Sequence, residues 1–220
     1  MITGEGGISS FIHRFIPAQS AQVSPGPTLL MLHGTGGDEN ALLDLGRMLA
    51  PGAALLSPRG KILENGMPRY FRRLAEGVFD LSDLTRRTHE LADFVETASV
   101  AYDFDPARVI AVGFSNGANI AGSMLLLRPS VLSAAVLLHA QVPLVPPSLP
   151  NLLGKPIFIG AGLADPLIPV NETERLVALL QQAGATVTTY WHNGGHEVSH
   201  GEVSAAREWL APLIESRGVV

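Results

Sequence analysis

Six short apolar runs alternate with five longer stretches of helical pattern along this chain. The apolar runs are Thr28–Leu32, Ala53–Leu56, Val109–Val112, Ala134–Leu138, Ile157–Ile159 and Thr186–Trp191. The helical stretches are Glu39–Leu49, Leu84–Ala101, Asn116–Leu127, Val170–Ala183 and Val203–Leu213. Most of the runs are continuously apolar, which is typical of parallel strands that are covered by helices on both faces. The alternation therefore predicts an α/β fold, with a doubly wound, mostly parallel sheet and helices on both of its faces.

The composition is that of a protein with a well-buried interior. Hydrophobic residues make up 46% of the 220 positions and charged residues only 16%, which excludes a disordered chain. No apolar run reaches the roughly 18 residues that span a bilayer, so we expect no membrane insertion. The proline-rich segment Pro143–Pro156 is short and leads directly into a strand. We therefore expect one domain over residues 1–220, with no large lid domain.

Charge and cysteine content exclude several functions. Fifteen basic and twenty acidic residues give a net charge of −5 without a basic stripe, whereas nucleic-acid binding normally needs a basic surface. The chain has no cysteine, which excludes disulfides, thiolate metal sites and a cysteine nucleophile. Met1–Ser10 has neither the basic region nor the apolar core of a secretory signal. We expect a cytoplasmic enzyme or binding protein.

The sequence Gly113-Phe-Ser-Asn-Gly117 lies where an apolar strand meets a helix. The pattern G-x-S-x-G is weak by itself, and a plain glycine-rich turn would also satisfy it. A nucleophile elbow, however, requires a strand before it and a helix after it, because the sharp turn raises the serine hydroxyl above the sheet edge. Both contexts are present, so we predict that Ser115 is a nucleophile.

A serine nucleophile needs a base, and the base needs an acid that orients it. In this kind of fold the chain order is Ser, then Asp or Glu, then His. Asp165 follows a predicted strand and is the only aspartate after Ser115, although a turn or capping aspartate is the alternative. His196 follows two glycines after the last strand, so we predict it as the base, with His192 as the fallback. Chain order disfavours His13, His33, His89 and His139, and His200 is expected to begin the final helix.

The loop after the first apolar run has the composition of an oxyanion hole. It reads Leu32-His-Gly-Thr-Gly-Gly-Asp38, and its glycines expose backbone N–H groups to a substrate. We predict Thr35 and Asn116, the residue after the nucleophile, as the two oxyanion donors. A phosphate-binding loop is the alternative, but neither G-x-G-x-x-G nor G-K-[ST] occurs here. We expect neither an organic cofactor nor a metal.

A basic and aromatic segment, Arg59–Arg73, carries five of the fifteen basic residues. We interpret it as a substrate loop, with Met67 and Phe71 as apolar contacts and Arg69 as a candidate partner for an anionic group. The alternative is a solvated loop whose arginines pair with acidic residues, namely Glu64, Glu76 and Asp80.

Together these motifs resemble the α/β-hydrolase superfamily, in its small carboxylesterase/phospholipase branch, which includes acyl-protein thioesterases. The resemblance runs from Thr28 to His200 through the loop 33–38, the elbow 113–117, Gly162-Leu-Ala-Asp-Pro166 and Gly194-Gly-His196. Residues 59–60, 64–67 and 113–119 are more narrowly similar to bacterial esterases related to the hydroquinone-inducible hydrolases. The resemblance implies Ser115, Asp165 and His196 as a catalytic triad. Acyl-protein thioesterases carry glutamine after the nucleophile, where this chain has Asn116, so protein deacylation is not carried over.

The prediction is a serine hydrolase that cleaves small carboxylic esters, short-chain or aryl, through an acyl-enzyme intermediate. An acyl thioesterase or a lysophospholipase with the same triad is the first alternative. A hydrolase-fold protein that binds a small ligand without turnover is the second. The expected partner is a small-molecule ester rather than nucleic acid or membrane, and a homodimer is left open.

Overall fold

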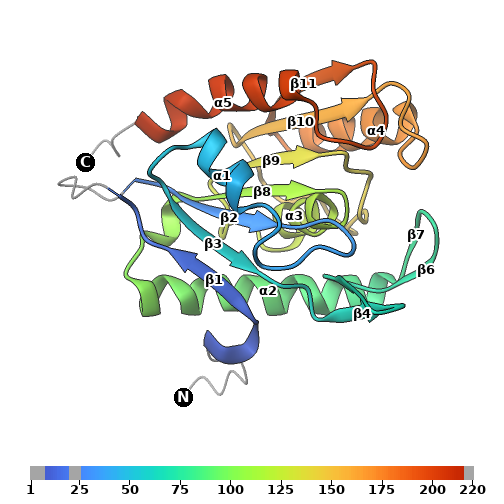
Figure 1. Ribbon diagram of the computed structural model, residues 1–220. Coiled ribbons are helices and arrows are strands. Elements are labelled where there is room, and N and C mark those ends of the chain that lie inside the picture. Colours follow the sequence, from blue (N-terminus) through green and yellow to red (C-terminus); the bar gives the residue numbers. More distant parts are fainter. Residues whose placement is uncertain (1–7, 20–25, 216–220) are drawn as a thin grey trace.

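The computed structural model describes residues 8–19 and 26–215, and a seven-stranded sheet forms its centre (Figure 1). The spatial order is β1-β3-β2-β8-β9-β10-β11. The strands are β1 (His13–Ile16), β2 (Thr28–Leu32), β3 (Ala54–Pro58), β8 (Val109–Phe114), β9 (Ala134–Leu138), β10 (Pro156–Gly162) and β11 (Thr186–His192). All pairs are parallel except β1 with β3. The doubly wound, mostly parallel sheet is confirmed, and β1 is an edge strand that the apolar pattern did not predict.

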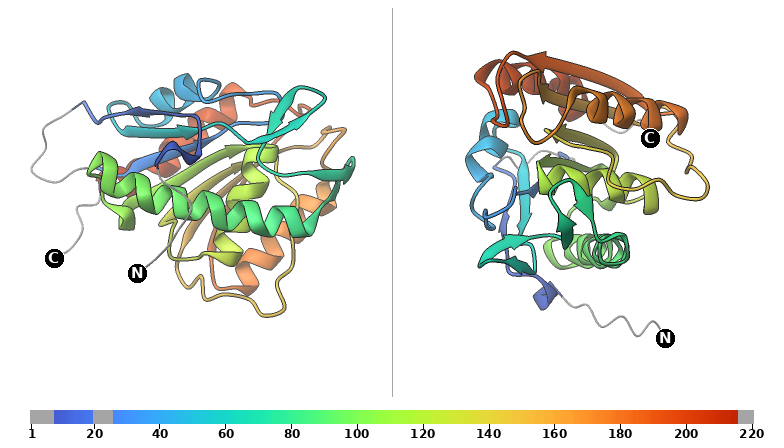
Figure 2. Two further views of the ribbon diagram at one scale, coloured as in Figure 1. Left: turned by 90° about the horizontal axis from the view of Figure 1, so that it is seen from below. Right: turned by 90° about the vertical axis from the view of Figure 1, so that its right-hand side faces the viewer.

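Helices cover both faces of this sheet (Figure 2). They are α1 (Leu43–Leu49), α2 (Leu81–Tyr102), α3 (Asn116–Leu127), α4 (Val170–Gln182) and α5 (His200–Glu215), and two short 3-10 turns lie at Ile8–Ser10 and Pro106–Arg108. Side chains of β2 alternate between the two faces, as a pleated strand requires. Leu29 and Met31 join the core under α1 and α5, whereas Leu30 and Leu32 join the core under α2, α3 and α4.

The segment between β3 and α2 forms two small antiparallel hairpins. They pair β4 (Ile62–Glu64) with β5 (Met67–Arg69), and β6 (Arg73–Ala75) with β7 (Val78–Phe79). The basic segment predicted as a loop therefore has regular structure of its own. Both hairpins project beyond the end of the sheet toward which the parallel strands point (Figure 1).

The order of the strands creates a crevice at that same end. The chain passes from β2 to β3 on one side and later returns to β8 on the other side of β2. The loops after β2 and β8 therefore diverge, and ligands of open α/β sheets bind at such switch points.

Two expectations concern the surroundings of the protein. Within the part of the chain that the structure describes, no helix has the length and apolar character needed to cross a bilayer. The expectation that Met1–Ser10 carries no secretory signal falls mostly on residues 1–7, which lie outside the described ranges.

Candidate active site

Ser115 occupies a strained turn between β8 and α3. Its φ of 52° and ψ of −116° are unusual for a residue with a side chain. The flanking glycines are required by close packing: a Cβ on Gly117 would lie 1.9 Å from the carbonyl oxygen of Leu32, and one on Gly113 would lie 2.6 Å from the backbone of α3. Ser115 therefore lies on a tight strand-to-helix turn, which is the backbone geometry that a nucleophile elbow requires.

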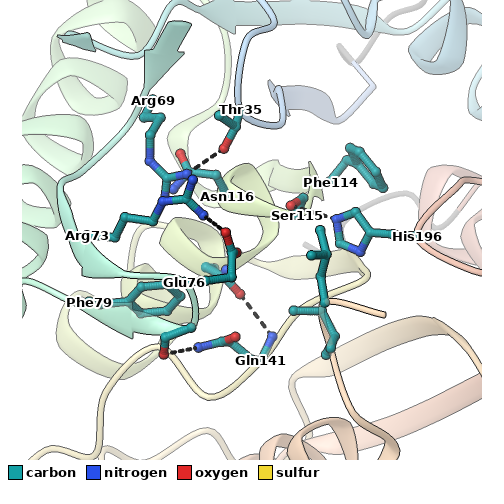
Figure 3. A pocket seen from close by; sticks show the side chains of 14 residues that line it. Thr35, Arg69, Arg73, Glu76, Phe79, Phe114, Ser115, Asn116, Gln141 and His196 are labelled. Carbon is teal, nitrogen blue, oxygen red and sulfur yellow. Dashed lines mark hydrogen bonds and ion pairs between the residues drawn. The ribbon is translucent and has the colours of Figure 1, made fainter. Parts of the chain in front are cut away.

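Ser115, His196 and Asp165 form one continuous chain of hydrogen bonds. The Ser115 Oγ lies 2.9 Å from His196 Nε2, and His196 Nδ1 lies 2.7 Å from Asp165 Oδ2. Asp165 follows β10 and His196 follows β11, so the ends of three strands supply the three side chains. Figure 3 shows the Ser115 hydroxyl and the His196 ring facing each other at the edge of a pocket.

The Asp165 carboxylate is buried and held by four donors. His139 and His196 both reach Oδ2, at 2.9 and 2.7 Å, whereas the N–H groups of Leu167 and Ile168 donate to Oδ1 at 2.8 and 3.0 Å. Burial alone would raise the pKa of Asp165, but these hydrogen bonds outweigh it and lower the pKa below its ordinary value of 3.8. The carboxylate is therefore ionised at neutral pH and faces the imidazole in a fixed orientation.

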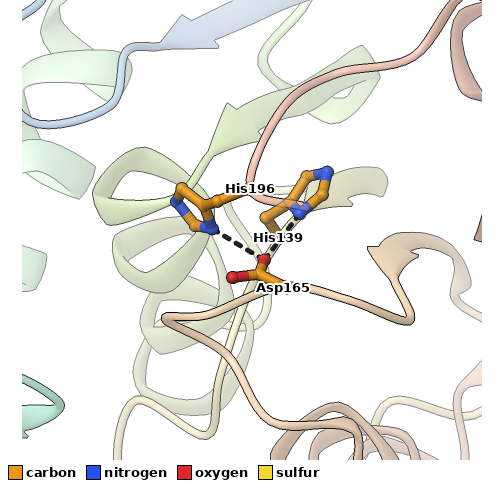
Figure 4. Close-up of side chains that lie close together, drawn as sticks. All are labelled: His139, Asp165 and His196. Atoms are coloured by element: carbon orange, nitrogen blue, oxygen red, sulfur yellow. Dashed lines mark hydrogen bonds and ion pairs between the residues drawn. The ribbon is translucent and has the colours of Figure 1, made fainter. Parts of the chain in front are cut away.

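His139 is a site residue that the sequence reasoning missed. Chain order disfavoured it as the base, but its Nδ1 bonds the Asp165 carboxylate from the side opposite His196 (Figure 4). It follows β9 directly, as Asp165 follows β10. Its position directly after a buried parallel strand was a signal that the sequence offered. The prediction did not use this signal, because it considered the histidines only as candidates for the base.

The two predicted oxyanion donors both border the pocket. The N–H of Asn116 is the first of helix α3, where no intrahelical acceptor exists. The N–H groups of Gly36 and Gly37 donate to Pro68 and Gly34, whereas the N–H of Thr35 has no acceptor among the described residues. Both groups are thus free to bind an oxyanion.

Side-chain contacts attach the first hairpin to Asn116 and to the loop 33–38, which carries Thr35. The Asn116 Oδ1 accepts the Tyr70 N–H at 2.8 Å, and Arg69 Nη1 donates to Thr35 Oγ1 at 2.6 Å. His33 donates from Nδ1 to the Gly34 carbonyl, so its Nε2 accepts the Gly60 N–H at 2.9 Å. Burial lowers the pKa of His33 below 6.5, which keeps the ring neutral in this tautomer.

A pocket of about 280 Å³ opens beside Ser115 (Figure 3). Its apolar lining comes from Phe79, Phe114, Leu167 and Ile168, and its polar lining includes Arg69, Arg73, Glu76, Asn119 and Gln141. Of the three predicted substrate contacts, only Arg69 lines this pocket. Phe71 is 0% exposed and packs in the core against Phe79, and Met67 is 41% exposed on the hairpin beside Gly36. The prediction of Phe71 as an apolar contact is therefore wrong, and Phe79 supplies an aromatic side chain to this pocket instead.

The arginines of this segment are paired, as the alternative interpretation expected. Arg69 lies 3.4 Å from Glu64, Arg73 pairs with Glu64 at 2.6 Å and also with Glu76, and Arg72 pairs with Asp80 at 2.9 Å. Two of them nevertheless border the pocket. The segment is therefore both a pocket wall and an ion-pair network.

Among the described residues, two groups of side chains have the spacing of a metal site: His139 with Asp165 and His196, and His139 with His192 and Glu202. In the first group, the atoms that would face a cation already bond one another. In the second, both imidazoles face Glu202 at ion-pair distance, 3.5 and 3.8 Å. We assign no metal to either group.

Comparison with known proteins identifies the family of this chain. The phospholipase/carboxylesterase family matches residues 17–214. The chain is 52% identical over 186 residues to the protein of Bacillus subtilis (strain 168) named "Putative hydrolase MhqD", covering 84% of this chain and 93% of that protein.

Solved structures agree with the family match. A carboxylesterase from Bacillus cereus is 47% identical, with a TM-score of 0.88 over 92% of this chain and 94% of the other. A carboxylesterase from Mesorhizobium loti is 30% identical, with a TM-score of 0.83 over 91% and 94%. The chain therefore belongs to the phospholipase/carboxylesterase family of α/β-hydrolases.

Proposed function

We propose that the protein is a serine esterase that hydrolyses small carboxylic esters, short-chain or aryl, through an acyl-enzyme intermediate. The observation that carries this proposal is the unbroken hydrogen-bond chain from Ser115 through His196 to Asp165, with its hydroxyl end at the pocket. A serine hydroxyl is a weak nucleophile at neutral pH, and a base oriented in this way activates it.

In the acylation step, Ser115 Oγ attacks the ester carbonyl carbon while its proton passes to His196 Nε2. The carbonyl oxygen becomes an oxyanion, which the N–H groups of Thr35 and Asn116 bind. Asp165 keeps the His196 proton on Nδ1 and stabilises the imidazolium. The tetrahedral intermediate then collapses, and the departing alcohol takes the proton from Nε2.

In the deacylation step, water enters where the alcohol left. His196 Nε2 accepts a proton from this water as its oxygen attacks the acyl carbon, and the same two N–H groups bind the second oxyanion. Collapse releases the carboxylic acid and returns the proton to Ser115 Oγ. The sequence of bonds requires no further reactant.

The dimensions of the pocket support a small substrate. Its volume of about 280 Å³ is at the lower limit of the roughly 300–1,000 Å³ of small-molecule sites. The apolar residues Phe79, Leu167 and Ile168 offer one wall to an acyl or aryl group, whereas Arg73 and Glu76 occupy another. We expect the rate to fall, rather than rise, for acyl chains beyond about eight carbons because the pocket is too small for them.

A fluorophosphonate probe tests the proposal directly. The wild-type protein should be labelled at Ser115, and Ser115→Ala should be neither labelled nor active on p-nitrophenyl acetate. A panel of p-nitrophenyl esters, acyl-CoAs and lysolipids then separates the esterase from a thioesterase and a lysophospholipase. Absence of labelling in well-folded wild-type protein would leave only the ligand-binding alternative.

A further inference from the structure

His139 adopts a backbone conformation that needs an explanation. It follows β9 with a φ of 55°, in the left-handed region that residues with a side chain rarely occupy. Its N–H still donates to the Gly160 carbonyl at 2.8 Å, so the backbone stays attached to β10. Its ring is 0% exposed. The turn thus places the His139 imidazole beside Asp165, the proposed catalytic acid, at a cost in backbone strain.

Both ring nitrogens of His139 face a carboxylate. Nδ1 lies 2.9 Å from Asp165 Oδ2, and Nε2 lies 3.5 Å from Glu202 Oε2. The second contact is an ion pair, longer than a hydrogen bond. A neutral imidazole has one N–H donor, and its other nitrogen would turn a lone pair toward a carboxylate. Only the imidazolium offers a proton to both neighbours.

Glu202 is a buried carboxylate at the start of α5. Its Oε2 accepts the Ser199 N–H at 3.2 Å, and Ser199 Oγ accepts the Glu202 N–H, which is a capping box. A capping glutamate is ordinarily solvated, but this one is 0% exposed and fills space beside Gly160, where a Cβ would lie 1.8 Å from its Oε1. The buried position of Glu202 therefore depends on the glycine in β10 as well as on the start of α5.

His192 also faces Glu202, at ion-pair distance. The Gly194 N–H donates to His192 Nδ1 at 3.0 Å, so the proton of the neutral ring is on Nε2. That nitrogen faces Glu202 Oε2 at 3.8 Å. Glu202 Oε2 thus accepts the Ser199 N–H and lies within ion-pair distance of His192 and His139, whereas its buried Oε1 has no hydrogen-bond partner among the described residues.

We propose that His139 is a positioning residue that remains an imidazolium between Asp165 and Glu202. This cation holds the Asp165 carboxylate in place and sets the net charge of the side chains next to His196. The role rests on the Ser115 hydrolysis proposed above. With His139 charged, the two carboxylates and the cation sum to −1, and protonation of His196 brings the cluster to zero. Burial opposes the charge on His139, but its contacts with Glu202 and Asp165 outweigh burial and raise its pKa above 6.5.

The charged and titratable groups that face His139 come from four parts of the chain. They are Asp165 after β10, Glu202 on α5, His192 at the end of β11 and His196 in the loop after it. The rings of His139 and His196 are 5.2 Å apart between centroids. At that distance, adding or removing one unit charge shifts the pKa of a neighbouring group by about one to two units.

The test is the acidic limb of the kcat/KM pH profile on p-nitrophenyl acetate. His139→Asn keeps a donor for Asp165 but removes the cation, leaving −2 behind His196, so the midpoint should rise by about one to two pH units. Adding Glu202→Gln to this variant restores −1 and should return the midpoint toward that of wild type. Ser199→Ala is the matched control: it removes the helix cap but no charge, so it should lower the melting temperature and leave the midpoint unchanged.

A spectroscopic measurement covers the case in which a variant fails to fold. In wild-type protein labelled with 15N-histidine, both ring nitrogens of His139 should carry protons at pH 7, where an ordinary histidine is mostly neutral. A neutral His139, or a His139→Asn midpoint equal to that of wild type while activity still depends on Ser115, would overturn the role of His139 alone. Activity that survives Ser115→Ala would instead overturn the proposed function, and the His139 spectrum would still stand.

Discussion

The Asn116 side chain is predicted to hold the oxyanion loop in place through the first hairpin. Its Oδ1 accepts the N–H of Tyr70, a residue that is 2% exposed, at 2.8 Å. The next residue back along the chain, Arg69, donates to Thr35 Oγ1 at 2.6 Å. Asn116→Ala removes the acceptor, so the contact that orders Tyr70 and Arg69 is lost while the Asn116 backbone N–H remains.

The expected magnitudes follow from these contacts. A buried N–H left without an acceptor costs about 1–3 kcal/mol of unfolding free energy. In a protein of this size, a loss of about 2 kcal/mol lowers the melting temperature by about 4–8 °C. Removing an oxyanion donor outright costs about 10²–10³-fold in kcat, so displacing Thr35 without removing it should cost about tenfold.

Thermal melts and steady-state kinetics on p-nitrophenyl acetate measure the two effects separately. Asn119→Ala is the matched control, because Asn119 lies one turn further along α3 and accepts the Gln141 N–H at 3.0 Å. It should destabilise the protein by a similar amount but lower kcat less, since Gln141 holds no predicted oxyanion donor. An Asn116→Ala protein that melts several degrees lower and keeps the wild-type kcat would refute the proposed link between Tyr70 and Thr35.

Three further predictions follow from the site. Asp165→Asn should lower kcat by about 10⁴-fold, because the amide no longer selects the His196 tautomer, and a loss below tenfold in folded protein would contradict the assignment. The lowered pKa of His33 means that the unfolded state binds its proton more readily, so stability should fall as the pH drops below 6.5, with a slope of at most about 1.4 kcal/mol per pH unit from this group. His33→Gln retains an acceptor for the Gly60 N–H and should reduce that slope in urea unfolding between pH 5 and 7.5; an unchanged slope would exclude His33 as its source. Arg69→Lys should lower kcat alike for acetate and hemisuccinate esters, because its guanidinium is needed at Thr35, and a loss confined to the anionic ester would instead make Arg69 a substrate anchor.

The elements that the sequence predicts best are those whose apolar pattern is continuous. The bounds of β2, β9 and α3 agree with the expected ranges to the residue. Helix α1 begins at Leu43 rather than Glu39, because Asp38 accepts the Asn40 N–H and forms a turn first. Helix α5 begins at His200, as expected for that residue, and the capping box of Ser199 and Glu202 accounts for the three residues before the helical pattern that starts at Val203.

The short strands escaped prediction for different reasons. Strand β1 is a four-residue edge strand of mixed polarity, so no apolar run marks it. The β4–β5 hairpin has strands of only three residues, but its turn, Asn65-Gly66, has φ values of 51° and 81°. An Asn-Gly pair between two extended segments is a strong hairpin signal, and that signal was available in the sequence.

Some residues of the candidate site could be predicted from the sequence, and others could not. Chain order and position after strands single out Ser115, Asp165 and His196, and the structure brings these three together. His139 and Glu202 could not be paired in advance, because their contact depends on how α5 lies over the end of β9, which no sequence spacing determines.

The basic segment Arg59–Arg73 borders the pocket, as its composition predicted, but its arginines are paired with acidic side chains. Arg69 and Arg73 border the pocket, but Glu64 and Glu76 pair with them, so these four side chains carry no net charge. An anionic substrate therefore gains little attraction from this wall. Arg69 also donates to Thr35 Oγ1 and so attaches the hairpin to the loop 33–38. Under the proposed function, we therefore expect the charged residues of the segment to affect the rate through the shape of this loop rather than through charge selection of the ester.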